Sequence, residues 1–170
     1  FSSFSKIIHN KYIEYSFQFF DNYLRHFSGS FLFISGDEIQ RNRVPEMGQM
    51  YWVDALFLLA GIYFLLKNKI KNSSFIFLWL AMAPIASALT FQSPHAIRSL
   101  NMVIPLIIIE SYGVLTIWKV KSLGFVNNFA ELIKFKNVEN VNDKAIIILR
   151  CIIAFVLIWS FSHYLHQYYV

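Results

Sequence analysis

Four apolar segments, each 17 to 19 residues long, constrain this chain more than any other feature of its sequence. The hydrocarbon core of a bilayer is about 30 Å thick, and a helix needs roughly 20 mostly apolar residues to cross it. Only 15% of the residues are charged, whereas a typical soluble domain carries about 25%. The pattern predicts an all-α, multi-pass membrane protein with four transmembrane helices, at 50–66, 75–91, 102–120 and 145–161.

Lysine residues gather in two of the connectors between these segments, at 67–74 and 121–144. The connector 92–101 contains no Lys, and Arg98 is its single Arg. Cytoplasmic loops of membrane proteins carry an excess of Lys and Arg. Both lysine-rich loops are therefore expected in the cytoplasm, and residues 1–49 outside. The net charge of +5 alone is compatible with nucleic-acid binding. Because the lysines flank apolar segments, we expect membrane lipid as the partner and no nucleic acid.

The outer N-terminal segment combines a predicted helix with a polar loop. Within 12–27, polar residues and apolar residues each recur every three or four positions, which indicates an amphipathic helix. It is too polar to span a bilayer and is expected at the outer interface. Residues 35–49 read as a polar loop. We thus divide the chain into an exoplasmic segment, 1–49, and a membrane domain, 50–170.

The sequence contains none of the standard motifs of phosphate-binding loops, zinc peptidases or dithiol sites. Its five histidines are scattered, so no metal site and no cofactor are predicted, although a divalent metal could still assist. Glu110 stands out because it lies about eight residues into the third predicted span. A charge at that depth costs at least about 2.5 kcal/mol, so Glu110 is expected to face a partner or a wet cavity.

Two outer loops carry the remaining polar candidates. Arg98 offers a planar guanidinium suited to phosphate, and His95 precedes it by three residues. If the third helix starts early, both side chains lie on one side and clamp a phosphate at the headgroup level. Contact of Arg98 with lipid headgroups alone is the alternative. The 35–49 loop adds the charged residues Asp37, Glu38, Arg41, Arg43 and Glu46, and a solvated face is their simplest interpretation.

Several short stretches together resemble a known family. They are Asn22-Tyr23-Leu24-x-His26-Phe27-Ser28, Gly36-Asp37, Pro45-x-Met47-Gly48-Gln49 and, after a span, Pro94-His95-x-x-Arg98-Ser99. Over about residues 8–115 the chain resembles the C-terminal membrane half of bacterial glycosyltransferase family 39-like proteins. These are similar to protein mannosyltransferases and the lipid A aminoarabinose transferase, and they have the GT-C fold.

The resemblance implies a multi-pass enzyme of the bacterial plasma membrane that transfers a sugar from a polyprenyl-phosphate donor to an acceptor on the outer face. It implies that Arg98 and His95 contact the donor phosphate. Glu38, Arg43 and Glu110 are our further candidates for the cavity or its outer loops, chosen from their positions in the sequence. The family's catalytic acid lies in an N-terminal half to which no segment here corresponds, and Asp37 is the one substitute candidate. Because the chain starts at Phe1, we expect a fragment that is inactive without that half.

A non-catalytic membrane subunit, a scaffold or a transporter fragment is the alternative function. Glu110, Pro84 and Pro105 favour it, because polar and proline-interrupted spans line transport pathways. The two functions predict that polar side chains gather at different places in the fold. A transferase gathers Asp37, His95 and Arg98 at the outer face, whereas a transporter surrounds Glu110 with partners at the midplane.

Overall fold

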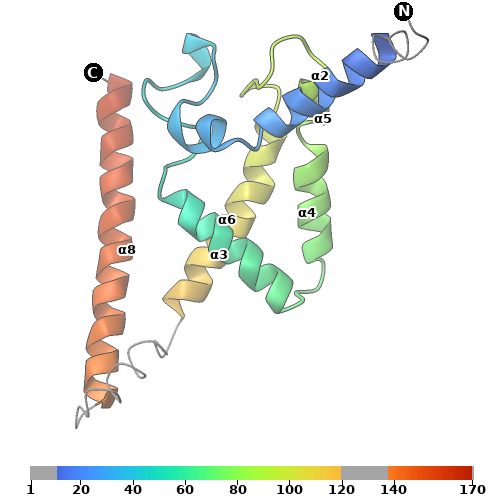
Figure 1. Cartoon of the computed structure of the whole chain (residues 1–170). Helices are drawn as coiled ribbons and strands as arrows, with labels where there is room; N and C mark the ends of the chain where they lie inside the picture. Colours follow the sequence, from blue (N-terminus) through green and yellow to red (C-terminus); the bar gives the residue numbers. More distant parts are fainter. Residues whose placement is uncertain (1–10, 120–137, 170) are drawn as a thin grey trace, which may run out of the picture.

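The computed structural model describes residues 11–119 and 138–169, and every regular element in these two ranges is a helix (Figure 1). The longer helices are α2 (Lys11–Arg25), α3 (Asp54–Lys67), α4 (Ser73–Met82), α6 (Val103–Trp118) and α8 (Val138–Tyr169). The shorter ones are η1 (Ser30–Ile34), η2 (Gln40–Asn42), α5 (Ile85–Ala88) and η3 (Leu100–Met102). The all-α prediction therefore holds for the described residues.

Two helices are long and apolar enough to cross a membrane, Leu100–Trp118 and Lys144–Tyr169. The prediction of four spans is not confirmed. With a rise of about 1.5 Å per residue, the 14 residues of α3 extend only about 21 Å. The second predicted span is interrupted between α4 and α5 at Pro84, because proline lacks an amide hydrogen and its ring clashes with the preceding helical turn.

The boundaries predicted for α2 and α6 are close to those in the structure, whereas those predicted for α8 are not. The predicted helix 12–27 is α2, and the predicted span 102–120 corresponds to η3 and α6. Helix α8 is much longer than the predicted span 145–161, so the end of the predicted cytoplasmic loop 121–144 is helical. The start of that loop lies outside the described residues.

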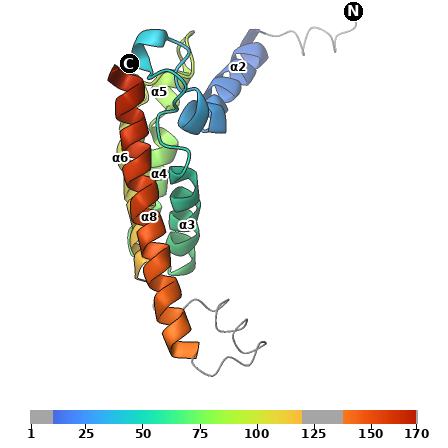
Figure 2. The ribbon, with the colours of Figure 1, turned by 90° about the vertical axis from the view of Figure 1, so that its left-hand side faces the viewer.

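Helices α3 and α6 cross in close backbone contact. A Cβ atom added to Gly61 would overlap the carbonyl oxygen of Ile109, and one added to Gly113 would overlap that of Phe57. Small residues allow apolar helices to approach this closely, which is a common device of helix packing in membranes. Helix α4 packs against α6 on another side, whereas α8 runs along the group of helices (Figures 1 and 2).

A single hydrophobic core joins helices α3 and α6 to η1, which lies above them (Figure 1). Phe31 and Leu32 of η1 are buried together with Leu58, Leu106 and Ile109 of α3 and α6. A smaller cluster joins Val53 and Phe57 to Ile153 of α8. The residues 35–49 and 89–101 lie over the same end of the helices, and we call these two loops together the polar cap (Figure 1).

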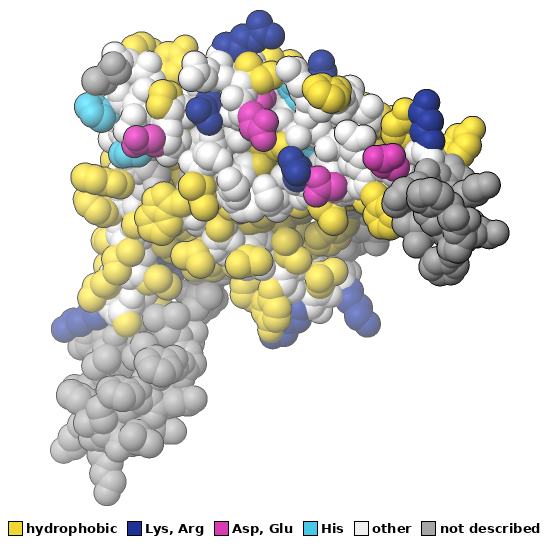
Figure 3. All heavy atoms as spheres, turned by 45° about the horizontal axis from the view of Figure 1, so that its top comes forward, with side chains coloured by type: hydrophobic (Ala, Val, Ile, Leu, Met, Phe, Trp, Pro, Cys, Tyr) yellow, Lys and Arg dark blue, Asp and Glu magenta, His cyan; other side chains and the backbone are white. Residues whose placement is uncertain are grey.

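Polar and apolar side chains are segregated on the surface. Figure 3 shows charged and histidine side chains over the cap end, hydrophobic side chains around the sides of the helices, and further Lys and Arg side chains at the opposite end. The hydrophobic side chains that remain exposed there include Leu59, Leu78, Ile104, Ile107, Ile147 and Phe155. Soluble monomers rarely expose contiguous apolar surface on this scale.

Candidate functional site: the polar cap and the cavity below it

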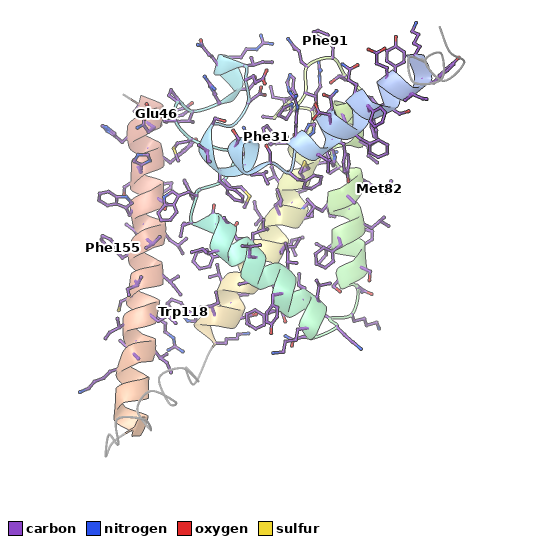
Figure 4. All side chains as sticks on the ribbon, viewed as in Figure 1. Phe31, Glu46, Met82, Phe91, Trp118 and Phe155 are labelled. Atoms are coloured by element: carbon purple, nitrogen blue, oxygen red, sulfur yellow. The ribbon has the colours of Figure 1, made fainter. Side chains whose placement is uncertain are left out.

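A buried histidine attaches helix α2 to α5. The Nδ1 atom of His26 lies 2.8 Å from the backbone oxygen of Asn22, and Nε2 lies 2.8 Å from the hydroxyl oxygen of Ser87. The Asn22 side-chain amide also donates to the backbone oxygen of Ala88 at 3.2 Å. Phe31 stands edge-on to the His26 ring with 5.7 Å between the ring centroids (Figure 4). Burial lowers the pKa of His26 below its ordinary value, so the neutral ring is favoured.

Asp37 connects the two loops of the cap. Its Oδ1 accepts a hydrogen bond from the Ile39 amide at 2.9 Å. Its Oδ2 accepts bonds from the Asn42 side chain at 3.1 Å and from the Ala96 amide at 2.8 Å. Burial would raise the pKa of Asp37, but these donated hydrogen bonds outweigh it and leave the pKa below its usual value. Three of its about four acceptor sites are occupied, so Asp37 is arranged as an anchor, and its lowered pKa makes it a weak base.

His95 lies beside Asp37 and keeps one nitrogen without a partner. Its Nδ1 is 3.8 Å from Oδ2 of Asp37, a separation longer than a hydrogen bond. The residue is 7% exposed, and no described atom forms a hydrogen bond with Nδ1. A buried ring nitrogen without a partner is uncommon in folded proteins, and it leaves an imidazole able to donate or accept one further bond.

Arg98 points elsewhere. Its Nη1 donates to the hydroxyl oxygen of Thr90 at 2.8 Å, and its side chain is exposed. Residues 96–99 form turns and α6 begins only at Val103, so His95 and Arg98 do not share the first turn of a helix. The structure thus pairs His95 with Asp37 and leaves Arg98 separately on the cap surface. Among the described carboxylates, none lies within ion-pair distance of Arg98.

The other two outer-loop candidates stand apart from this pair. Glu38 is exposed and Arg43 is half-buried, and neither forms an ion pair with any described residue. The solvated face expected for the charges of the 35–49 loop therefore describes Glu38 well.

A cavity of about 270 Å³ lies below the cap. It is bounded by η1, by residues 47–51, by the first half of α6 and by Tyr164 of α8. Glu110 lies on its wall next to Asp54, and the two carboxyl groups interact directly. The Tyr51 amide donates to Oδ2 of Asp54 at 2.8 Å, but Oδ1 of the same carboxyl group is buried and accepts no hydrogen bond.

Two features of this site do not follow from sequence reasoning. Asp54 lies about one turn from the outer end of the predicted span 50–66, where a carboxylate can reach water, and nothing in the sequence pairs it with Glu110. Helix α3 starts lower than α6 because η1 and the 35–49 loop occupy the space above it, and the two carboxyl groups therefore meet (Figure 1). The attachment of His26 to Ser87 was also not foreseen, and the histidine at the end of an amphipathic helix was its only signal.

No family model matches this chain, and neither the curated proteins nor the solved structures include a significant match to it. The function must accordingly be argued from the geometry of the cap and of the cavity.

Proposed function

We propose that this chain is the membrane-embedded C-terminal part of a glycosyltransferase that uses a polyprenyl-phosphate sugar donor at the outer face of a bacterial plasma membrane. Two helices of membrane-spanning length and exposed hydrophobic side chains around the molecule support a lipid environment. The lysine-rich connector between α3 and α4 lies at the end opposite the cap (Figure 1), and this supports a cap that faces outward.

The hydrogen bond from the Ala96 amide to Asp37 is the observation that carries the proposal. It connects the Gly36-Asp37 and Pro94-His95-x-x-Arg98 elements, which bear the family resemblance and are far apart in sequence. Two elements of one functional site must meet in the fold, and these two meet on the polar end of an otherwise apolar molecule. The bond joins two motifs whose resemblance lies in their residues alone, so it supports the proposal independently.

In this proposal Arg98 binds the donor phosphate. Its guanidinium is exposed on the cap, it is positioned by Thr90, and no described carboxylate neutralises it. A guanidinium in this state is suited to a bidentate contact with a phosphate. Asp37 holds the loop that carries Arg98, whereas His95 is buried beside Asp37 and is not assigned to the phosphate contact. The catalytic acid comes from the N-terminal half of the enzyme.

Binding of farnesyl phosphate tests the proposal with the chain itself. We expect the chain in detergent micelles to bind farnesyl phosphate more tightly than farnesol, which has the same chain without the charge. Arg98→Ala should weaken the binding about tenfold or more, since a hydrogen bond to a charged group contributes about 1.5–3 kcal/mol. Arg41→Ala removes another exposed arginine of the cap and serves as the matched control. Equal binding of the two ligands, or equal loss in both variants, would contradict the proposal.

A transporter or scaffold fragment is the second candidate, and the contact between Glu110 and Asp54 favours it. Buried carboxyl pairs at membrane depth often mark ion or proton pathways. Leu106 and Met102 line the cavity beside this pair, and its described lining contains no further acidic group. Binding of farnesyl phosphate by the native chain, together with loss of that binding in Arg98→Ala, separates the transferase from this candidate.

A further inference from the structure

The cavity below the cap contains two carboxyl groups without a compensating cation. No described residue that lines the cavity is basic, and the carboxyl groups of Asp54 and Glu110 face each other. Buried charges in proteins are ordinarily paired, because moving an isolated carboxylate from water into an apolar site is costly. The pair therefore needs either a shared proton or a positive group from outside the chain.

One oxygen of the pair is left open to such a group. Asp54 is 6% exposed, its Oδ2 is occupied by the Tyr51 amide, and its Oδ1 has no hydrogen-bond donor other than a protonated Glu110 carboxyl group. Leaving a buried acceptor without a donor is unfavourable. A ligand that carries N–H donors and a positive charge would satisfy both Oδ1 and the charge of the pair.

The rest of the cavity suits an organic ammonium better than a metal ion. The described residues include no group of three or more histidine, cysteine or acidic side chains able to hold a metal. The walls are mainly apolar, with Phe31, Met102 and Leu106 among them. The rings of Tyr51 and Tyr164 lie edge-to-face with centroids 6.4 Å apart, and aromatic rings attract ammonium groups.

The cavity also reaches the apolar side of the molecule. Val103 and Ile107 of α6 line it, and they are 40% and 51% exposed. An amphiphile in the surrounding lipid could therefore place its headgroup inside and leave its chain along α6. We propose that this cavity binds a primary ammonium group, supplied either by an aminolipid or by a water-soluble amine. This inference does not rest on the proposed transferase function.

Native mass spectrometry of the full chain in detergent micelles tests the proposal. Phosphatidylethanolamine and phosphatidylcholine with identical acyl chains are added as probes, because only the first carries N–H donors. We expect at least about fivefold higher occupancy by phosphatidylethanolamine, since one charge-assisted hydrogen bond is enough for such a preference. Equal occupancy is the result for a pair held by a shared proton, and it would overturn the proposal.

A double variant, Asp54→Asn with Glu110→Gln, should reduce the occupancy by phosphatidylethanolamine to that of phosphatidylcholine. Glu38→Gln removes an exposed carboxyl group and should leave the occupancy unchanged. Because the double variant could misfold, the native chain is also tested with competitors. Dodecylamine should displace the lipid, whereas dodecanol should not, and equal displacement by both would refute recognition of the ammonium group. Displacement by water-soluble ethanolamine would identify free amines as the source, and its failure would identify a lipid.

Discussion

Asp37 is 1% exposed, and its carboxylate accepts hydrogen bonds from three donors in both loops of the cap. Asp37→Asn preserves its shape but turns one acceptor into a donor that faces donors. We expect this variant to lower the free energy of unfolding by about 1–3 kcal/mol, measured by chemical denaturation in detergent micelles. Glu38→Gln, at the exposed neighbouring position, should change it by less than about 0.5 kcal/mol. Equal stability of the two variants would show that Asp37 does not hold the cap together.

His26 makes the attachment of α2 sensitive to pH. Its pKa in the folded chain lies below its ordinary value of 6.5, mainly because of burial, although nearby Asp37 opposes this shift and His95 adds to it. The unfolded state then binds more protons, so the contribution to stability is complete above about pH 6.5 and decreases as pH falls from there towards the folded pKa.

Hydrogen exchange of the α2 amides should therefore speed up between about pH 7.5 and 5.5, after correction for the intrinsic pH dependence of exchange. His26→Gln takes up no proton in this range and should remove the change. Corrected protection that is independent of pH in the native chain would contradict this role of His26.

At the scale of elements, the crossing of α3 and α6 depends on two glycines. Gly61→Ala places a methyl group where the Ile109 carbonyl oxygen lies, so the helices must separate. We expect a loss of about 1–3 kcal/mol in the free energy of unfolding, which is typical of overpacking. The control is Gly29→Ala, because nothing lies within 4 Å of a Cβ atom there. A Gly61→Ala chain as stable as the control would show that the contact is looser than the structure indicates.

Some of the helices can be predicted from the sequence, and others cannot. Hydropathy predicts α6 and α8 because long apolar runs are sufficient evidence of long helices, and periodicity predicts α2. The spans predicted at 50–66 and 75–91 are not confirmed, because the helices there are shorter than the length that crosses a bilayer. An apolar run does not reveal whether its first residues are used in a turn, as before Asp54, or whether a proline such as Pro84 interrupts the helix.

The candidate site, too, can be predicted from the sequence only in part. The sequence indicates which residue types could bind phosphate or face a cavity, because Arg98, His95 and Glu110 are unusual where they occur. It does not indicate which of them meet. That depends on the level at which each helix starts, which pairs Glu110 with Asp54 and His95 with Asp37 while Arg98 turns towards Thr90.

At the scale of the whole molecule, charged groups at the cap, apolar sides and lysines at the opposite end form three zones (Figure 3). The proposed phosphate contact requires that the apolar zone lies in a membrane with the cap outside. In that arrangement Gln92 in the cap faces the exterior, and Lys69 between α3 and α4 faces the cytoplasm. Both residues are exposed in the structure.

Cysteine labelling of intact bacterial cells with a membrane-impermeant maleimide tests this arrangement most directly. The background is Cys151→Ser, which removes the single native cysteine, and the two test variants are Gln92→Cys and Lys69→Cys. The account predicts labelling at position 92 in intact cells, and labelling at position 69 only after the cells are broken. Labelling of position 69 in intact cells, or protection of position 92, would contradict it.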